Sequence, residues 1–447
     1  MIGYVNSVKV SFLVGLAVTS IVIQLLFNKA VPFPFVDEKF HFDQLHKYCD
    51  GNFTYWNPKI TTPPGLYVLS FAYVRALSLL FGSDSCTLPA VRFFNVIATL
   101  LLFNVSYALT KDKSLTSFRR ALNALNCTSF PILYFSTFLY YTDCCSLLLL
   151  SCCYVMAKAR QPMYSALFGL LSICIRQSNV VWVVFTAAIY FLESFEEYAK
   201  QRGFSYHYGN WRKLVMSKLF WRDVILPELS YGLVVFLFLS FAYMNGGFAL
   251  GDRQAHQVCL HIPQLFYCVA VIFLFDWPVL LFRSQVLSFA KSLYANKTLY
   301  AFVVLLMAVC IHRLTFVHPY LLADNRHLTF YIWRRWFAMH YLCRFLLIPL
   351  YIFAFYCVTC KLRRYNAMWK LIFWVCVAAC CVPNRLLEMR YFIVPFYMWR
   401  IHCPTPRTNK LVLEFLFHSL INLALLLIFL LKTFRWADEM EPQRIIL

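Results

Sequence analysis

Asp37 and Glu38 are neighbouring carboxylates that follow shortly after the first apolar stretch, Val10 to Phe27. A low dielectric and a second acid raise the pKa of a carboxylate, which suits it to act as a general base. Aromatic residues and prolines surround the pair, among them Trp56, and aromatic faces stack well on sugar rings. The alternative is a solvated interfacial loop whose acids only neutralise nearby lysines.

Two later groups combine acids, arginines and histidines. Their members are Asp252, Arg253 and His256 in the first group, and His318, Asp324, Asn325, Arg326 and His327 in the second. Arginine and histidine donors beside aromatics suit a sugar phosphate. The alternatives are a capped polar rim for the first group and an aromatic belt with snorkelling arginines for the second.

The spacing of these groups does not favour a metal. His256 and His261 lack the i, i+4 spacing of zinc-binding helices. The same loops offer no carboxylate cage for magnesium or manganese. We therefore expect neither a metal nor another cofactor.

Residues so far apart in sequence need a scaffold that brings them together. Of the 447 residues, 61% are hydrophobic and 14% are charged, whereas a soluble domain carries about 25% charge. The sequence therefore predicts an all-α polytopic membrane protein, a single domain over 1–447, with about 12–14 transmembrane helices. After the first stretch, the expected spans are 93–109, 121–141, 143–157, 162–175, 179–193, 230–249, 262–282, 298–316, 337–359, 370–383, 391–400 and 411–431.

Charge decides where the ambiguous segment 63–81 lies. It is apolar, but it carries Arg75 at its middle, where a charge in lipid costs about 2.5–3.5 kcal/mol. If 63–81 lies along the interface, every later basic loop becomes cytosolic, as the positive-inside rule requires. We therefore predict a juxtamembrane helix over 63–81 within a non-cytosolic first loop, 28–92, and a cytosolic loop over 194–229.

This topology places the polar groups on one face of the membrane. Beyond the first loop, the basic residues on that face are all arginines: Arg176, Arg253, Arg313, Arg326, Arg334, Arg335, Arg385 and Arg390. A guanidinium presents a planar fork to phosphate oxygens and stays charged when partly buried. The pattern indicates phosphate or pyrophosphate recognition, although chance and snorkelling at helix ends would give the same count.

Several partner classes are disfavoured. The net charge of +21 is spread in small groups between apolar stretches, which indicates membrane lipid rather than nucleic acid as the partner. The 18 cysteines lie mostly in apolar stretches, where cysteine is a small hydrophobe, and form neither a zinc pattern nor a disulfide framework. No Gly-rich phosphate loop is present, so a lipid-held donor is favoured over a nucleotide.

Longer runs around these residues resemble a known family, the endoplasmic-reticulum alpha-1,2-glucosyltransferases that add the terminal, third glucose to the lipid-linked oligosaccharide. The runs are Asp37-Glu38 through His41, Trp56 through Tyr67, Arg176-Gln177-Ser178-Asn179, Gly251-Asp252-Arg253 with His256, and His318 through His327. They come in the family's order and cover nearly the whole chain. Members usually have Met before the acid pair, where this chain has Val36.

The resemblance implies a GT-C architecture in the endoplasmic-reticulum membrane, with the active site facing the lumen. The donor would be dolichyl-phosphate glucose, and the acceptor the diglucosylated nine-mannose oligosaccharide on dolichyl pyrophosphate. Transfer with inversion needs one base, Asp37 or, as runner-up, Glu38. Arg326, His327 and Arg253 would stabilise the leaving phosphate without metal. The remaining substrate-binding residues would be His41, Trp56, Arg176, Asp252, His256, His318, Asp324 and Asn325.

Two other classes stay open. A mannosyltransferase of the same architecture is not excluded by the acid pair alone. A transporter or channel-associated protein should carry ionisable residues at mid-membrane and paired discontinuous repeats. Here the acids and histidines of the motifs lie at expected helix ends on one face, and the sequence shows no internal repeat. The predicted first loop also contains an N-glycosylation acceptor sequence at Asn52, whereas the other matches are Asn104 and Asn126 in apolar stretches and Asn296 in a basic loop.

Overall fold

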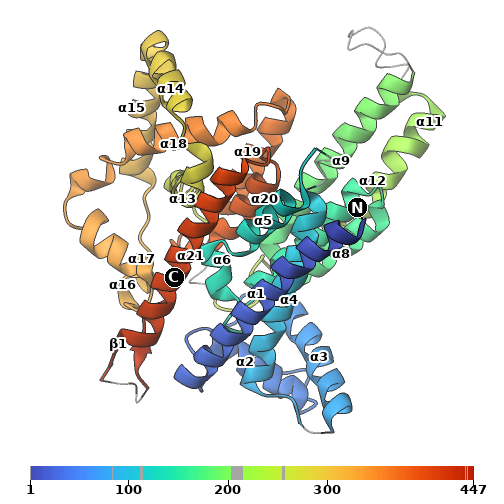
Figure 1. Ribbon diagram of the computed structural model, residues 1–447, viewed down its shortest axis with the longest axis vertical. Coiled ribbons are helices and arrows are strands. Elements are labelled where there is room, and N and C mark those ends of the chain that lie inside the picture. The colour runs from blue at the N-terminus through green and yellow to red at the C-terminus, as the bar shows by residue number, and fades with distance from the viewer. Residues whose placement is uncertain are drawn as a thin grey trace.

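The computed structural model describes residues 2–82, 84–110, 114–202, 215–253, 257–437, 439 and 441–447. The chain is almost entirely helical (Figure 1), because backbone groups in lipid must bond within their own segment. The helices are α1 (Ile2–Ala30), α2 (Glu38–Cys49), α3 (Gly65–Phe81), α4 (Leu88–Leu109), α5 (Ser117–Thr128), α6 (Pro131–Ser136), α7 (Asp143–Lys158), α8 (Pro162–Ile175), α9 (Val180–Gln201), α11 (Lys218–Phe220), α12 (Leu226–Asn245), α13 (Pro263–Leu280), α14 (Arg283–Ala295), α15 (Lys297–Leu314), α16 (Pro319–Ala323), α17 (Leu328–Ile332), α18 (Ile348–Lys361), α19 (Ala367–Cys381), α20 (Ile393–Ile401) and α21 (Thr408–Leu431). Short 3₁₀ or π turns lie at Gln177–Asn179, Trp221–Ile225, Trp333–Phe337, Tyr341–Arg344 and Met389–Phe392, and strands β1 (Thr433–Phe434) and β2 (Gln443–Arg444) pair antiparallel.

The polytopic all-α prediction is confirmed. Among the described residues, 8 segments are long and apolar enough to cross a membrane. They are Ser7–Ala30, Leu88–Leu109, Gln177–Gln201, Lys218–Asn245, Pro263–Leu280, Lys297–Leu314, Tyr341–Lys361 and Thr408–Leu431. The shorter apolar helices Gly65–Phe81, Pro162–Ile175 and Ala367–Cys381 do not reach this length. The count falls below the expected number because several predicted spans are short or broken.

The expected single span over 121–141 is wrong. Its residues divide into α5, α6 and a buried turn over 137–142, and Pro131 opens the second helix. The weak span 391–400 is likewise a 3₁₀ turn followed by the short α20. Hydropathy does not register these breaks, and broken helices are tolerated at membrane depth where protein covers them.

The predicted loop 194–229 is shorter than expected. Helix α9 continues to Gln201, and α11 begins at Lys218. The charged end of α9 is supported by an ion pair between Arg160 and Glu197, with Nη2 and Oε2 at 2.9 Å. Polar sequence here therefore extends a helix instead of ending it.

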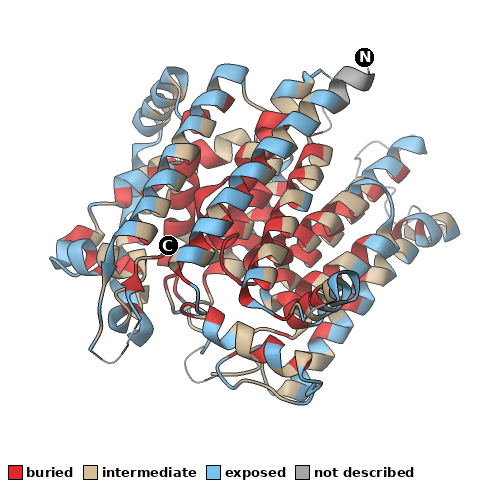
Figure 2. Cartoon of the chain, turned by 60° about the horizontal axis from the view of Figure 1, so that its bottom comes forward, coloured by how far each residue is buried: buried red, intermediate tan, exposed pale blue. Residues whose placement is uncertain are grey.

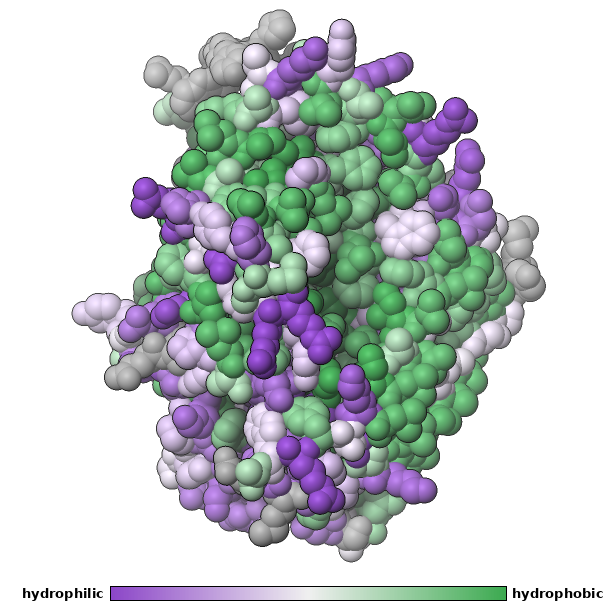
Figure 3. Space-filling view, turned by 90° about the vertical axis from the view of Figure 1, so that its left-hand side faces the viewer, coloured by the Kyte–Doolittle hydropathy of each residue, from purple (hydrophilic) through white to green (hydrophobic). Residues whose placement is uncertain are grey.

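The polar insertions gather at opposite ends of the molecule. In Figure 1, α2, α3 and β1 lie at the lower end, whereas α14, α15 and α11 lie toward the upper end. Buried residues fill the middle of the bundle, and the peripheral helices expose their outer sides (Figure 2). Figure 3 shows broad hydrophobic areas on the face in view, with hydrophilic side chains at its upper and lower ends and also in groups at mid-height. The broad hydrophobic areas suit a membrane-embedded body.

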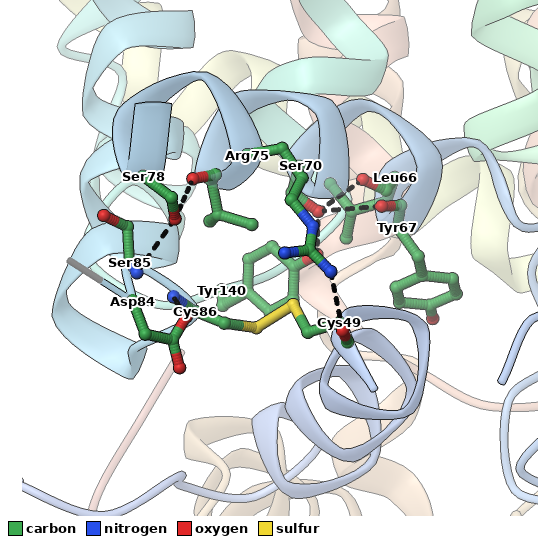
Figure 4. The surroundings of a disulfide bond; sticks show 11 residues. Cys49, Leu66, Tyr67, Ser70, Arg75, Ser78, Asp84, Ser85, Cys86 and Tyr140 are labelled. Carbon is green, nitrogen blue, oxygen red and sulfur yellow. Dashed lines mark hydrogen bonds between the residues drawn. A yellow bond between two sulfur atoms is a disulfide. The ribbon is translucent and has the colours of Figure 1, made fainter. Parts of the chain in front are cut away.

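The first loop is a folded unit joined by a disulfide. The bond links Cys49 at the end of α2 to Cys86 just before α4 (Figure 4). Arg75 of α3 donates from Nη2 to the Cys49 carbonyl oxygen at 2.9 Å, so the guanidinium is bound to the loop. The interpretation that the cysteines form no disulfide is wrong for this pair, because both lie in the polar loop and not in apolar stretches. The other described cysteines are free thiols.

Candidate active site

Asp37 lies at the first turn of α2, after the bend that follows α1. Val36 before it is buried and has φ 53°, a strained conformation for a β-branched residue. Such strain persists only where the surrounding packing imposes it, often at functional sites. Oδ2 of Asp37 accepts a hydrogen bond from Nη2 of Arg390 at 2.9 Å, and the Asp37 side chain is 41% exposed.

The charges around Asp37 favour its ionised form. Burial raises the pKa of the carboxyl, but the positive charge of Arg390 and its hydrogen bond outweigh burial and lower the pKa below its usual value. The sequence argument predicted a raised pKa because it could not place an arginine against this acid. Asp37 is therefore a carboxylate at neutral pH.

The Glu38 side chain points away from Asp37 and is fully buried. Its side chain and that of Arg92 are both 0% exposed, and two contacts join them, Nε to Oε1 at 2.8 Å and Nη2 to Oε2 at 2.6 Å. The backbone N–H groups of Tyr140 and Phe35 also donate to the two oxygens. Arg92 reaches on to the Val31 carbonyl oxygen. Glu38 thus ties together α1, α4 and the turn after α6, with no surface for a substrate.

Arg390 is the centre of a second ionic network. It pairs with Glu388 and approaches Asp143, with Nη1 and Oδ2 at 3.7 Å. Asp143 in turn pairs with Arg176, one of the predicted substrate-binding residues. The Arg390 guanidinium also lies 4.7 Å from the ring centroid of Tyr141. The network fixes the direction from which Arg390 reaches Asp37.

His41 and Trp56 lie on the aromatic side of the site. Nδ1 of His41 shares a hydrogen bond of 2.7 Å with the Tyr67 hydroxyl, and the Trp56 ring packs edge-on against Tyr67. Burial lowers the pKa of His41 to about 4, so the imidazole is neutral. Within the described residues, Nε1 of Trp56, the Tyr141 hydroxyl and Oε1 of Gln177 are buried without a hydrogen-bond partner. Buried donors and acceptors of this kind suit sugar hydroxyls.

The Thr-Thr-Pro-Pro-Gly run joins separate parts of the chain. The Thr61 carbonyl oxygen accepts from Nε2 of Gln177 at 3.0 Å and from the Leu250 N–H at 3.1 Å. A Cβ on Gly251 would overlap the backbone of Pro58, and one on Gly65 would overlap the backbone of Cys174. The glycines of both predicted motifs are therefore required by close backbone approach.

The Asp324–His327 loop forms the opposite side of the site. Asp324 receives Nε and Nη2 of Arg326 as a fork, at 2.9 and 2.7 Å, and Nε2 of His327 lies 3.6 Å from Oδ2 of Asp324. Asn325 accepts from Nε1 of Trp436 at 2.9 Å. The Arg326 guanidinium lies 5.9 Å from the ring centroid of Phe35, which places the loop beside the turn that carries Asp37.

The other predicted residues have local roles in the structure. His318 is buried and caps α16 by accepting from the Tyr320 N–H. Asp252, with φ 43°, accepts from the Tyr320 hydroxyl at 2.9 Å. Arg253 is exposed and donates to the Ala249 carbonyl oxygen in its own loop. His256 lies outside the described residues.

Sequence reasoning missed Asp143 and Tyr141 as parts of the site, and Arg92 as the buried partner of Glu38. All three stand within or beside apolar stretches, where the only signal is an ionisable or hydroxyl group in a hydrophobic setting. In the sequence, Glu388 and Arg390 form a small polar group for which core packing is an equal alternative. The described residues contain no group of 3 or more His, Cys, Asp or Glu arranged to hold a metal ion.

Comparison with known proteins identifies the family of the chain. The family model described as "DIE2/ALG10 family" matches residues 31–401. Relatives named Dol-P-Glc:Glc(2)Man(9)GlcNAc(2)-PP-Dol alpha-1,2-glucosyltransferase include a human protein, 34% identical over 97% of this chain and 98% of its own length. The mouse protein is 35% identical, with 97% and 98% covered, and the Arabidopsis thaliana protein is 31% identical, with 96% and 98% covered. No solved structure matches the chain. The chain belongs to the DIE2/ALG10 family.

Proposed function

We propose that this protein transfers glucose from dolichyl-phosphate glucose to the Glc2Man9 lipid-linked oligosaccharide, in alpha-1,2 linkage and with Asp37 as the base. The relatives that it matches almost end to end are named for this reaction. The reaction completes the oligosaccharide precursor of N-glycans. No metal takes part in this proposal.

The observation that carries the choice of base is the exposure of the acids at the site. The side chain of Asp37 is 41% exposed, against 11% for Glu388, 1% for Asp143 and 0% for Glu38. A general base must lie within hydrogen-bond reach of the proton that it removes. Only Asp37 among the four offers an accessible carboxylate oxygen.

The chemistry is a single displacement. An acceptor hydroxyl oxygen attacks the anomeric carbon of glucose while Asp37 takes its proton, and the bond from that carbon to the phosphate oxygen breaks. Dolichyl phosphate leaves with the electron pair, and the configuration at the carbon inverts. Arg390 keeps Asp37 ionised, and in this proposal His327, whose side chain is 21% exposed, donates to the leaving phosphate. Arg326 is already engaged by Asp324 and orients the loop.

Donor and acceptor choice are tested together with the purified protein in lipid vesicles. Dolichyl-phosphate glucose and dolichyl-phosphate mannose are each offered with Glc2Man9 and Glc1Man9 lipid-linked acceptors. The proposal expects transfer only from the glucose donor to the Glc2Man9 acceptor. Transfer from the mannose donor would support the mannosyltransferase alternative, and no transfer in any arm would remove the proposed function.

The proposal also places the site in the lumen of the endoplasmic reticulum. Disulfides persist in oxidising compartments, and the Cys49–Cys86 bond lies in the first loop with the site. Of the four N-glycosylation acceptor sequences, Asn52 and Asn296 are exposed, in the first loop and between α14 and α15. In Figure 1 these segments lie toward opposite ends of the molecule.

The two acceptor sequences give a matched test of orientation. In membranes from cells that make N-glycans, we expect Asn52→Gln to remove an endoglycosidase-sensitive shift on a gel, and Asn296→Gln to leave it. A shift that depends on Asn296 would reverse the orientation.

A further inference from the structure

The described residues of the segment 433–447, namely 433–437, 439 and 441–447, fold back beside the active site. In Figure 1, β1 lies at the lower end with α2, and the end of the chain lies close to α16 and α17. The side chains of Gln443 and Ile446 are buried, at 2% and 4% exposure. Terminal segments are usually poorly ordered unless specific contacts tie them down. The burial of these residues therefore indicates that specific contacts hold the segment in place.

Their backbone pairs with the Asp324–His327 loop. The Ile446 N–H donates to the Arg326 carbonyl oxygen at 2.7 Å, and the Leu328 N–H donates to the Ile446 carbonyl oxygen at 2.8 Å. These two bonds form a parallel bridge between Ile446 and His327. The loop therefore has its backbone fixed on both sides of His327.

Side chains of the same segment engage the loop a second time. Nη1 of Arg326 donates to Oε1 of Gln443 at 3.2 Å, and the guanidinium lies 4.6 Å from the Trp436 ring centroid. Nε1 of Trp436 donates to Oδ1 of Asn325 at 2.9 Å. Asn325 and Arg326 therefore each have a partner within residues 433–447.

The segment is also anchored on the Asp37 side. Arg444 donates to the carbonyl oxygens of Ala30, at the end of α1, and Phe429, at 3.0 and 2.8 Å. Lys39, in the first turn of α2, pairs with Glu439 at 3.1 Å between Nζ and Oε1. The segment thus contacts the chain both before and after Asp37, as well as the loop that carries His327.

We propose that residues 433–447 are a positioning element that holds the Asn325–His327 loop against Asp37 for use of the donor. The donor assignment rests on the proposed function. Gln443 and Ile446 are its positioning residues, because they touch Arg326 and its backbone instead of the reacting groups. The element acts on the phosphate-binding side of the site and leaves the aromatic side, with Trp56, untouched.

Full-length variants test the effect on donor use. Gln443→Met leaves Nη1 of Arg326 without its acceptor, and Ile446→Pro removes the N–H that bonds to Arg326. Each should raise the apparent KM for dolichyl-phosphate glucose by about fivefold or more, with the KM for the oligosaccharide acceptor unchanged. Gln443→Glu keeps an acceptor for Arg326, so its apparent KM for dolichyl-phosphate glucose should stay near that of the wild type. Glu441→Gln, on the exposed part of the same segment, is the matched control.

Hydrogen–deuterium exchange provides a readout that needs no activity. Peptides covering 324–332 should exchange faster in Gln443→Met and Ile446→Pro, whereas α4 peptides should not change. Unchanged exchange in 324–332, or donor and acceptor KM values that rise together, would overturn the positioning role. If the wild-type protein failed to use the donor, the proposed function would fall, while the exchange comparison would still decide whether the segment holds the loop.

Discussion

Asp37 and Glu38 are neighbours in sequence, and each faces an arginine, but the two pairs differ in what surrounds them. Glu38 and Arg92 are 0% exposed; the N–H groups of Phe35 and Tyr140 donate to the carboxylate, and Arg92 donates to the Val31 carbonyl oxygen. Asp37 meets Arg390 at an open surface and is 41% exposed. The same pair of charges is therefore a structural tie in one case and, in the other, leaves an accessible carboxylate for the proposed reaction.

A third network extends the comparison. Arg400 pairs with Glu414 at 2.9 Å and approaches Asp276 at 3.4 Å, and the exposure of all three side chains is at most 1%. Like the Glu38–Arg92 pair, it joins helices, here α20, α21 and α13. Ionisable residues within the apolar body thus serve packing in this protein. The solvent exposure of Asp37 distinguishes the candidate site from these buried networks.

Removing the charge of Asp37 should produce the largest loss of activity. Asp37→Asn keeps size and hydrogen bonding but cannot accept the hydroxyl proton, so the rate should fall by about 10²- to 10⁴-fold. Initial rates of glucose transfer by the purified variant measure the effect. Asp50→Asn, an exposed acid in the same loop, is the control and should keep full activity. Near-normal turnover by Asp37→Asn would transfer the role of base to another group.

Breaking the sealed pair should reduce stability and spare chemistry. Glu38→Gln leaves Arg92 buried without a counter-charge, at a cost of about 3–5 kcal/mol in the free energy of unfolding. Thermal unfolding in detergent should show this loss, with turnover per folded molecule close to wild type. Adding Arg92→Met should recover part of the stability, because both charges are then removed. Lost turnover with unchanged unfolding would instead make Glu38 the base.

The disulfide should have a smaller effect, again on stability. It closes a loop between positions 37 residues apart, and such bonds contribute about 2–4 kcal/mol. Cys49→Ser and Cys86→Ser should lower the unfolding temperature equally, and the double variant should add nothing. Additive losses would show that the two cysteines act separately.

Replacing Arg390 should shift the pH dependence of transfer more than it changes the maximal rate. It lowers the pKa of Asp37, so wild-type kcat/KM should fall only when pH drops below the usual carboxyl range and the base becomes protonated. In Arg390→Gln the pKa of Asp37 rises, and the acidic limb should move to higher pH. A limb that stays in place would show that another group controls it.

Much of the site was predictable because its motifs are local. Turn-forming and polar residues are visible in the local sequence at three places: the acid after the first helix, the Thr-Thr-Pro-Pro-Gly run and the loop ending at His327. The division between Asp37 and Glu38 was not predictable, since both follow the same helix and only Arg92, far along the chain, distinguishes them.

The fold was harder to predict where an apolar segment is surrounded by protein instead of lipid. The break between α5 and α6 lies within an apolar stretch, and hydropathy gives the same signal for a continuous span. Asp143 was hidden in the same way, one residue before a pair of cysteines. Residues 433–447 have neither helical periodicity nor an apolar run, so their contacts with the loop at Arg326 appear only in three dimensions.

The smallest expected effect is that of removing divalent ions. Each acid facing the Arg390 network already has a guanidinium partner: Asp37 and Glu388 pair with Arg390, and Asp143 pairs with Arg176. A metal ion would have to displace these arginines, and a single leaving phosphate is stabilised by charge-assisted hydrogen bonds worth about 1.5–3 kcal/mol each. Transfer should therefore be unchanged in excess EDTA and not increase with added manganese. Activity lost on chelation and restored by one divalent ion would contradict this mechanism and turn attention to Asp252 and Asp324.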